Sequence, residues 1–348
     1  MGLVEKKFNW EDYSEKFTVL ARNEGRDAIY AELCLSYAHR LYSNNIPIIY
    51  DVEHLCKLVG YDKYYVLGAS YETEKFYRKF KIPKKSGGFR TIHEPLPSLK
   101  EIQRWILDNI LYNINISKHA KGFIHDLSIK DNAKYHRNQP CVLSLDIKDF
   151  FPSIMRHRVY GIYRSIGYTQ LISNILSRIC TLNESLPQGA PTSPALSNII
   201  CFNLDRRLAG FSKKYDYRYT RYADDITISG NIVAGRVIRF VKKILGDYDL
   251  FLNDNKTRLM QRHQRQEVTG IVVNEKMQTP KEIRRHVRQE VYYINKYGMD
   301  SHLDKIKDVR SNYVKHIIGI VNYIKFVNPN DRHAAQALSI LMENYNKK

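Results

Sequence analysis

Alternation of apolar and polar residues predicts β-strands in the middle of the chain. Over residues 141–146 the side chains of one face are apolar, and Asp146 ends the strand on the opposite face. On both sides of residues 222–225 the sequence alternates again around a tight Ala-Asp turn, which is typical of a β-hairpin. Both predicted elements therefore present carboxylates, because the tip of the hairpin carries Asp224 and Asp225.

Helical periodicity dominates the two ends of the chain. Residues 28–41 carry apolar residues at helical spacing, and in the last region Ile283, Val287, Val291 and Ile294 form one apolar stripe. The remaining pattern predicts helices at about 99–111, 168–181, 195–210 and 234–248, a basic hairpin at 80–92, short strands between 250 and 273, and an irregular polar segment at 120–140.

The charge of the chain narrows the class of partner. Its 348 residues contain 55 Lys and Arg against 36 Asp and Glu, a formal net charge of +19. Such an excess favours binding to nucleic acid or to an anionic membrane surface. No segment approaches the roughly 20 apolar residues of a membrane span, the first residues do not indicate a signal peptide, and the five cysteines are scattered. We expect a cytoplasmic protein that handles nucleic acid.

Carboxylates gathered on a basic chain indicate a metal site that acts on a polyanion. If the hairpin pairs beside the first strand, Asp224 or Asp225 meets Asp146 across the sheet. Such carboxylates suit two Mg²⁺ ions about 3.5–4 Å apart, which would serve a phosphoryl-transfer reaction. The alternative is that Asp225 and Asp149 cap turns or pair with the neighbouring Arg221 or Lys148, and for Asp149 this alternative is favoured.

Motifs in a fixed order make the chain similar to reverse transcriptases. Asp146 with Phe150-Phe151, Leu-Pro-Gln-Gly at 186–189, Tyr-Ala-Asp-Asp at 222–225 and Lys256-Thr257 follow one another as in that family. The resemblance covers about Tyr77 to the C-terminus. Two further segments resemble signatures of bacterial retron reverse transcriptases: Asn-Ala-Lys-Tyr-His at 132–136 and Val-Thr-Gly at 268–270.

This resemblance implies an α+β, right-hand polymerase architecture. Fingers and palm would combine an antiparallel sheet with helices, and the thumb would be all helical. The expected regions are an N-terminal helical region at 1–75, fingers at 76–145 with a retron-type insertion at 120–140, a palm at 141–278 that includes fingers elements at about 155–190, and a thumb at 279–348.

The resemblance also implies roles for individual residues. Asp146, Asp224 and Asp225 match the catalytic carboxylates that hold two Mg²⁺ ions, and Lys256 matches a lysine proposed to protonate the pyrophosphate leaving group. The residues expected at the incoming nucleotide, with Phe151 as a steric gate against a 2′-hydroxyl, are Lys84, Lys85, Arg90, Phe151, Gln188 and Gly189. The residues expected to bind RNA are Asn132, His136, Val268, Thr269, Gly270, Arg284, Arg285 and Arg288.

Two of these assignments have equal structural alternatives. Asn132 and His136 have no evident catalytic task, and they serve either as part of a polar loop over bound RNA or in hydrogen bonds that stabilise the loop. Val268-Thr269-Gly270 is also compatible with an ordinary strand that bends at its glycine.

The implied function is RNA-directed DNA polymerisation on a cognate structured RNA. By resemblance, priming from a 2′-hydroxyl of that RNA would give a branched RNA–DNA hybrid (msDNA), dNTPs would be the substrates, and a separate effector protein would serve defence against phage. The alternatives are a diversity-generating or group II intron reverse transcriptase and a catalytically silent RNA-binding scaffold. A metal-dependent nuclease is disfavoured because no water-activating base lies near the acids in sequence.

Overall fold

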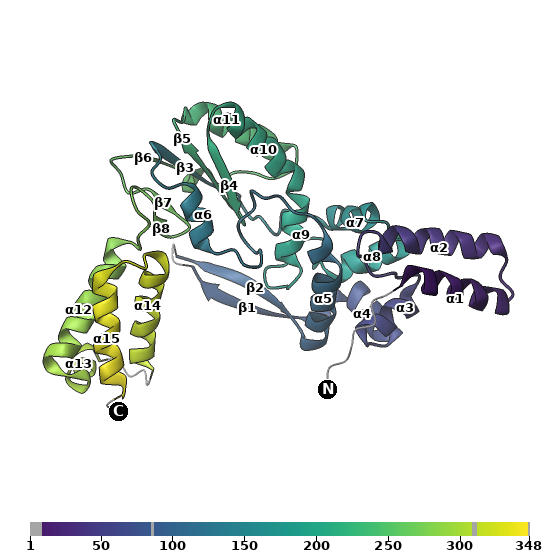
Figure 1. Cartoon of the computed structure of the whole chain (residues 1–348), viewed down its shortest axis with the longest axis horizontal. Coiled ribbons are helices and arrows are strands. Elements are labelled where there is room, and N and C mark those ends of the chain that lie inside the picture. Colours follow the sequence, from purple (N-terminus) through teal and green to yellow (C-terminus); the bar gives the residue numbers. More distant parts are fainter. Residues whose placement is uncertain (1–8, 85–86, 308–311, 347–348) are drawn as a thin grey trace. The chain divides into compact units, whose positions relative to one another are not determined.

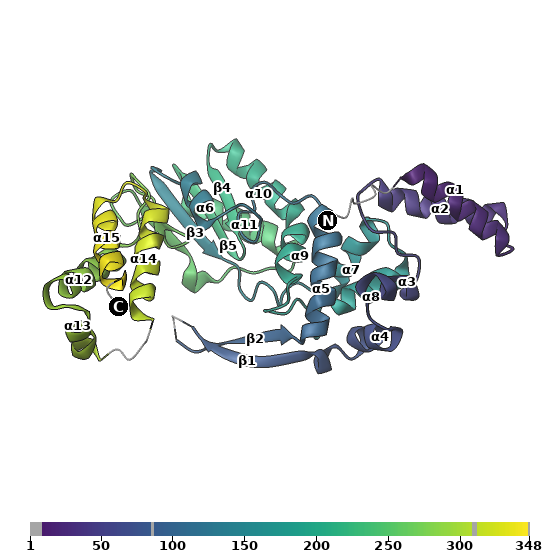
Figure 2. The same cartoon turned by 60° about the horizontal axis from the view of Figure 1, so that its bottom comes forward.

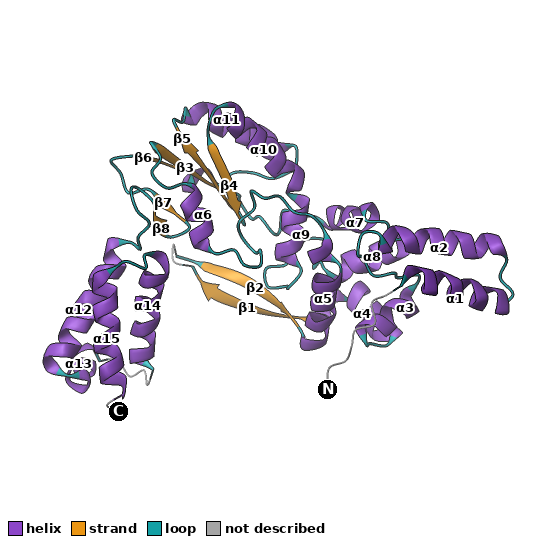
Figure 3. Cartoon of the chain, viewed as in Figure 1, coloured by secondary structure: helices purple, strands orange, loops and turns teal. Residues whose placement is uncertain are grey.

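Helices and antiparallel strands together make up the protein, which confirms the α+β class (Figure 3). The computed structural model describes residues 9–84, 87–307 and 312–346. Contacts within the chain divide it into unit one, residues 1–117 and 149–203, and unit two, residues 118–148 and 204–348. The boundaries of fingers, palm and thumb stay predictions, and the predicted insertion at 120–140 falls into unit two.

Unit one is mostly helical, and several of its helices begin at side chains that cap them. Asn9, Asp27, Asp51 and Asp62 each accept a hydrogen bond from a backbone N–H of the first turn, which satisfies an amide that the helix leaves unpaired. The long pair α1 and α2 lies side by side in both views (Figures 1 and 2). The helices are α1 (Trp10–Asn23), α2 (Ala28–Tyr42), α3 (Val52–Val59), α4 (Lys63–Tyr71), α5 (Pro97–Asn109), α7 (Arg156–Ser165), α8 (Gln170–Ile179) and α9 (Ser193–Ile200).

The basic hairpin predicted at 80–92 is present in unit one. Strands β1 (Tyr77–Pro83) and β2 (Phe89–Pro95) pair antiparallel, with Phe80 opposite Ile92, and Figure 2 shows them as a long two-stranded ribbon. The loop with the Gln-Gly motif docks on this ribbon, because the His93 amide donates to the Gln188 carbonyl at 2.8 Å.

A four-stranded antiparallel sheet forms the centre of unit two. Its strand order is β4-β5-β3-β6, with β3 at Cys141–Asp146, β4 at Arg218–Tyr222, β5 at Asp225–Gly230 and β6 at Arg258–Gln261. The side chains of β3 and β5 are largely buried on both faces, which is more than the predicted alternation requires. Helix α11 (Ala234–Gly246) follows the hairpin, and most of helix α10 (Phe202–Lys214) belongs to the same unit.

Two expectations about helices need correction. The segment predicted as irregular contains helix α6 (Ile129–Tyr135), which a reciprocal capping box between Ser128 and Asp131 starts. The helix predicted at 195–210 is two helices, α9 and α10, because the first ends at Cys201. Neither correction changes the residues predicted for the acidic hairpin.

The C-terminal part of unit two is helical as predicted. The expected apolar stripe is confirmed, since Val287, Val291 and Ile294 are buried and Ile283 packs against them. Among the described residues no helix has both the length and the apolar character that crossing a membrane requires. The elements are β7 (Glu267–Val268), β8 (Ile271–Val272), α12 (Lys281–Tyr297), α13 (Met299–Ile306), α14 (Tyr313–Val327) and α15 (Arg332–Asn346).

Candidate active site

The acidic turn between β4 and β5 brings three aspartates together in unit two. Tyr222 pairs with Asp225 across the hairpin, so Ala223 and Asp224 form a two-residue turn. In the sheet register Asp225 lies opposite Asp146, and the Ile147 amide donates to the Asp224 carbonyl at 2.9 Å. The geometry therefore selects Asp225 as the cross-strand partner of Asp146, between the two partners that the sequence left open.

Burial and neighbouring like charges act in the same direction at this turn. The pKa of Asp225 is raised to about 6, first by burial and then by the negative charges of Asp224 and Asp146. The Lys256 ammonium opposes this effect and donates to Asp146 Oδ2 at 2.7 Å. That hydrogen bond is also the main cause of the raised pKa of Lys256. One ammonium thus faces three carboxyl groups.

The donor set of the acidic turn fits Mg²⁺ in its chemistry. Carboxylate oxygens are the protein ligands that Mg²⁺ takes, and a cation would offset the repulsion that raises the pKa of Asp225. Among the residues that the structure describes, no three His, Cys, Asp or Glu side chains are arranged as a metal cluster. In the present conformation the Lys256 ammonium provides the positive charge beside Asp146, and ion binding would require the carboxylates to turn toward a common point.

Asp149 belongs to unit one. Its φ is 45°, in the left-handed region, and its carbonyl accepts a hydrogen bond from the Ser153 amide at 2.9 Å. This backbone geometry is that of a turn, the alternative that the sequence favoured for Asp149.

The residues predicted at the incoming nucleotide belong to unit one. Lys84 and Arg90 are exposed on the β1–β2 hairpin, and Lys85 lies outside the described residues. Position 189 requires glycine for two reasons. Its φ is +128°, which side chains with a Cβ rarely adopt, and an added Cβ would lie 2.5 Å from the His93 carbonyl oxygen. Their joint role with the acidic turn stays a prediction.

The two adjacent phenylalanines differ in exposure. Phe150 is 3% exposed and belongs to the core, whereas Phe151 is half-buried. Their rings make a tilted contact with centroids 5.6 Å apart. Phe150 therefore packs in the core, and the role of Phe151 as a gate stays a prediction.

Asn132 and His136 are fully buried on and next to α6. His136 Nδ1 lies 2.7 Å from Ser229 Oγ, His136 Nε2 lies 2.7 Å from Thr220 Oγ1, and Thr220 donates to Asn132 Oδ1 at 2.6 Å. Burial lowers the pKa of His136 to about 3. In this conformation both side chains are buried and hydrogen-bonded internally, which favours the alternative of loop-stabilising hydrogen bonds, and a direct contact with RNA stays a prediction.

The Val-Thr-Gly segment packs against the same helix. Val268 is buried in a cluster with Ala133 of α6 and Val327 of α14. Thr269 donates through its hydroxyl to the Ile129 carbonyl at 3.3 Å, and Gly270 has φ +80°. This segment thus joins α6 to the C-terminal helices rather than presenting Val268 to solvent.

The basic residues predicted on the last helical region are on the face of α12 away from its apolar stripe. Arg285 and Arg288 are exposed, and Arg284 is half-buried with its Nε donating to the Thr279 carbonyl at 3.2 Å. Two of the three guanidinium groups are therefore accessible to an anionic partner.

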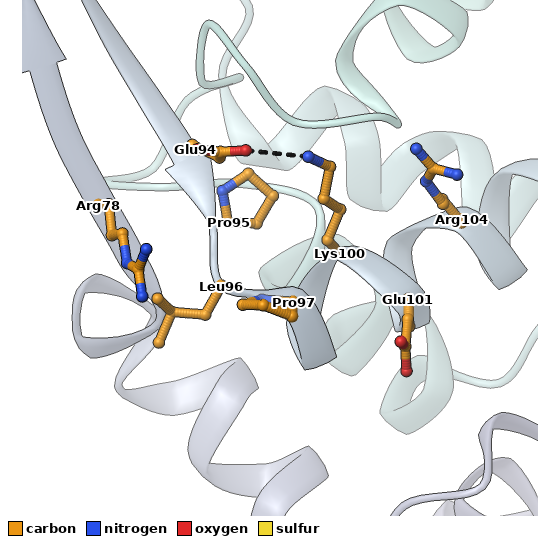
Figure 4. A pocket seen from close by; sticks show the side chains of 8 residues that line it. All are labelled: Arg78, Glu94, Pro95, Leu96, Pro97, Lys100, Glu101 and Arg104. Atoms are coloured by element: carbon orange, nitrogen blue, oxygen red, sulfur yellow. Dashed lines mark hydrogen bonds and ion pairs between the residues drawn. The ribbon is translucent and has the colours of Figure 1, made fainter.

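A separate pocket of about 400 Å³ in unit one lies between the base of the β1–β2 hairpin and α5 (Figure 4). Lys100 Nζ pairs with Glu94 Oε1 at 3.0 Å across it, and Arg78, Glu101 and Arg104 also line it. The two signs of charge alternate around this pocket, so its lining does not select an anion or a cation.

One feature of the acidic turn was not predicted from the sequence. Arg221, which only the alternative interpretation paired with a neighbouring aspartate, forms a fully buried ion pair with Asp205 of α10. The signal available in the sequence was an Arg directly before Tyr-Ala-Asp-Asp, but no spacing rule connects it to an acid 16 residues earlier.

Comparison with protein families identifies the class of protein to which this fold and site belong. Residues 82–315 match the family model described as reverse transcriptase (RNA-dependent DNA polymerase). This match spans well over half of the chain and includes the acidic turn, Asp146, Lys256 and the Gln-Gly loop. The chain therefore belongs to the reverse transcriptase family.

Similar curated proteins define the type within this family. The chain is 34% identical over 261 residues to the retron Ec86 reverse transcriptase of Escherichia coli, covering 73% of this chain and 81% of that protein. It is 35% identical over 291 residues to the retron Mx65 reverse transcriptase of Myxococcus xanthus, covering 78% of this chain and 66% of that protein. The chain is a bacterial retron reverse transcriptase by this similarity.

Among solved structures, the telomerase of Candida albicans with a fragment of telomeric RNA aligns with a TM-score of 0.42 at 11% identity. The alignment covers 80% of this chain and 65% of that one. A likeness of this size carries no argument about the site.

Proposed function

We propose that this chain extends DNA on an RNA template at the acidic turn, by a two-metal mechanism. The single observation that carries the proposal is the register that sets Asp225 opposite Asp146, with Asp224 at the turn between them. Bound Mg²⁺ ions would activate the primer hydroxyl and stabilise charge on the leaving pyrophosphate. The three aspartates would hold these ions.

Lys256 is proposed to act beside the carboxylates as the proton donor to pyrophosphate. Its ammonium lies 2.7 Å from Asp146 Oδ2, and its side chain is about half exposed. A donor at this distance from the carboxylates would be released from Asp146 when cations take up the negative charge. After a change of side-chain rotamer, Lys256 would donate its proton to the leaving pyrophosphate as a general acid.

The incoming deoxynucleotide is proposed to contact unit one. Lys84, Lys85 and Arg90 would bind the triphosphate through charge-assisted hydrogen bonds. The Gln188–Gly189 backbone would approach the nucleotide closely, and the exposed part of Phe151 would exclude a ribose 2′-hydroxyl. The fixed docking of this loop on β2 supports a preformed surface.

The RNA is proposed to bind the exposed basic residues rather than the buried signature side chains. Arg285 and Arg288, with Arg284, would contact phosphates, and the net charge of +19 supports this partner. Asn132, His136, Val268, Thr269 and Gly270 would shape the protein beneath that surface.

The similarity to retron reverse transcriptases supports a narrower proposal. The template would be a cognate structured RNA whose own 2′-hydroxyl primes synthesis, which gives a branched RNA–DNA product (msDNA). A separate effector protein acting with this product in defence against phage completes the proposal.

Substitution of Asp224 tests the polymerase function. Asp224→Asn should abolish dNTP incorporation in a primer-extension assay while RNA affinity stays within about twofold, because the amide removes charge at the turn and no basic contact. Asp247→Asn is the matched control, since the Asp247 carboxylate forms an exposed ion pair with Arg207. Full activity of Asp224→Asn would overturn the assignment, and a wild-type chain that binds RNA without incorporating dNTPs would support the silent scaffold.

A further inference from the structure

A buried ion pair lies directly behind the acidic turn. Arg221 of β4 and Asp205 of α10 both have fully buried side chains. Arg221 Nε donates to Asp205 Oδ1 and Nη2 donates to Asp205 Oδ2, each at 2.8 Å, which is a bidentate pairing. The Tyr219 hydroxyl donates to the same Asp205 Oδ1 at 2.7 Å. The guanidinium is therefore held in one plane by contacts on two of its three nitrogens.

The third nitrogen of this guanidinium reaches the turn itself. Arg221 Nη1 donates to the Ala223 carbonyl at 3.1 Å. Ala223 has φ 56°, a left-handed conformation that costs energy for a residue with a Cβ. Such a conformation persists only where surrounding contacts fix it. The hydrogen bond from Arg221 to the Ala223 carbonyl is one such contact.

The segment before α6 holds the turn from a second side. The Arg221 amide donates to the His119 carbonyl at 2.9 Å, and the Lys121 amide donates to the Arg221 carbonyl at 2.7 Å. At Gly122 an added Cβ would lie 2.8 Å from the Ala223 amide nitrogen. Only glycine permits this close approach, so the backbone of the turn is enclosed from behind.

Stability alone does not account for the ion pair. Desolvation of two buried charges offsets their attraction, so apolar residues of similar volume would serve the core equally well. What apolar residues would not supply is the donor to the Ala223 carbonyl. Lysine would not supply it either, because a single ammonium does not reproduce the planar fork that meets both Asp205 and the turn.

We propose that Arg221 is the positioning residue of the acidic turn, with Asp205 fixing its guanidinium. This inference rests on the proposed polymerase function for its consequence in catalysis. The pair sets where the carboxylates of Asp224 and Asp225 stand relative to Asp146. Mg²⁺ demands near-ideal octahedral geometry, so a turn released from Arg221 should bind the ion more weakly and react more slowly.

The test replaces the buried ion pair and the Tyr219 hydroxyl together, so that no charged side chain is left unpaired, and the Ala223 carbonyl loses its Arg221 donor by design. In the triple variant Asp205→Leu, Tyr219→Phe and Arg221→Met, the fold should persist, and the thermal midpoint reports this. Amide hydrogen exchange at residues 222–226, measured by mass spectrometry, should become at least 10-fold faster. The single-turnover rate should fall 10- to 100-fold, and the half-saturating Mg²⁺ concentration should rise at least fivefold, while RNA affinity is unchanged.

Two further variants separate positioning from general stability. Arg221→Lys keeps the charge and should show the same faster exchange at the turn, which keeps the proposal testable if the triple variant does not fold. Tyr219→Phe is the matched control, because it removes a hydroxyl from Asp205 and leaves the contact with Ala223 intact. It should exchange and react like wild type.

The outcomes distinguish this inference from the proposed function. Wild-type exchange at residues 222–226 in folded Arg221→Lys or in the folded triple variant would overturn the positioning role. A wild-type chain without polymerase activity would instead overturn the proposed function, and the exchange rates would still decide whether Arg221 fixes the turn.

Discussion

The acidic turn at 222–225 and helix α6 show how differently two sequence motifs are used within unit two. The turn gathers three carboxyl groups around one ammonium, so its charges are incompletely compensated. At α6, Asn132 and His136 are fully buried. His136 is hydrogen-bonded to Thr220 of β4 and Ser229 of β5, and Asn132 accepts from Thr220. The first motif gathers like charges, and the second stabilises the strands of the hairpin through internal hydrogen bonds.

The pKa values of Asp225 in the turn and His136 beside α6 differ in the same way. Burial is the first cause in both, and it disfavours the charged form of each group. The pKa of Asp225 is raised to about 6 and its next causes are two neighbouring negative charges, which a bound cation would relieve. The pKa of His136 is lowered to about 3, and its neutral imidazole already has two partners. A motif specific to a subfamily is thus not necessarily a contact with its substrate.

The largest effect should follow from Asp225→Asn. Loss of one carboxylate should lower the rate of dNTP incorporation roughly 10³-fold, a change of several kcal/mol in activation free energy. Stability without metal should rise on the order of 1 kcal/mol, because one of three like charges is removed. Primer extension and urea unfolding in EDTA measure the two effects.

A surface aspartate provides the comparison for this variant. Asp247→Asn should change neither quantity, since its ion pair with Arg207 is exposed. If Asp225→Asn instead lost stability, the carboxylate would be an internal brace, and the contrast between the two regions would disappear.

The sequence predicted the turn well because its signals are local. Period-two alternation predicted β3, β4 and β5, and the pairing of Asp146 with a hairpin aspartate was expected only if the hairpin lay beside β3, which the strand order of the sheet confirms. The choice of Asp225 needed the register. Helix α6 has seven residues and too few apolar positions for a periodic signal, so its capping box was the only local mark.

The buried partners escaped prediction because they are distant in sequence. His136 meets Thr220 and Ser229 across 84 and 93 residues, and no spacing rule connects them. The pairing of Arg221 with Asp205 depends on how α10 packs against β4. Polar residues whose partners come from other elements have the same pattern in sequence as residues that contact a ligand.

The second-largest effect tests whether His136 stabilises the strands of the hairpin. His136→Ala should lower the free energy of unfolding by about 3 kcal/mol, because it leaves a cavity and two buried hydroxyls without their partner. The rate per folded molecule at low temperature should stay within a few fold of wild type. Urea unfolding and single-turnover extension provide the two numbers.

An exposed residue of α6 provides the control for His136→Ala. Lys134→Ala on α6 should change stability by less than about 0.5 kcal/mol. A His136→Ala protein that keeps its stability and loses RNA affinity would mean that this imidazole contacts RNA in another conformation.

The smallest effect is the pH dependence of stability that His136 contributes. The pKa of His136 is about 3 in the folded chain against an ordinary value of 6.5, so the unfolded chain binds the proton more readily. The contribution is fully present above pH 6.5 and is lost as the pH falls toward 3, on the order of 2 kcal/mol between pH 7 and pH 5.

The variant His136→Gln isolates this contribution, because it removes only the titration of His136. The other titrating groups are common to both proteins, including Asp225, whose contribution to stability changes with pH in the opposite direction. The wild-type minus variant difference in unfolding free energy should therefore decrease from pH 7 to pH 5. Parallel curves would show that the folded chain accepts a proton at His136, and α6 would then be open to its surroundings like the acidic turn.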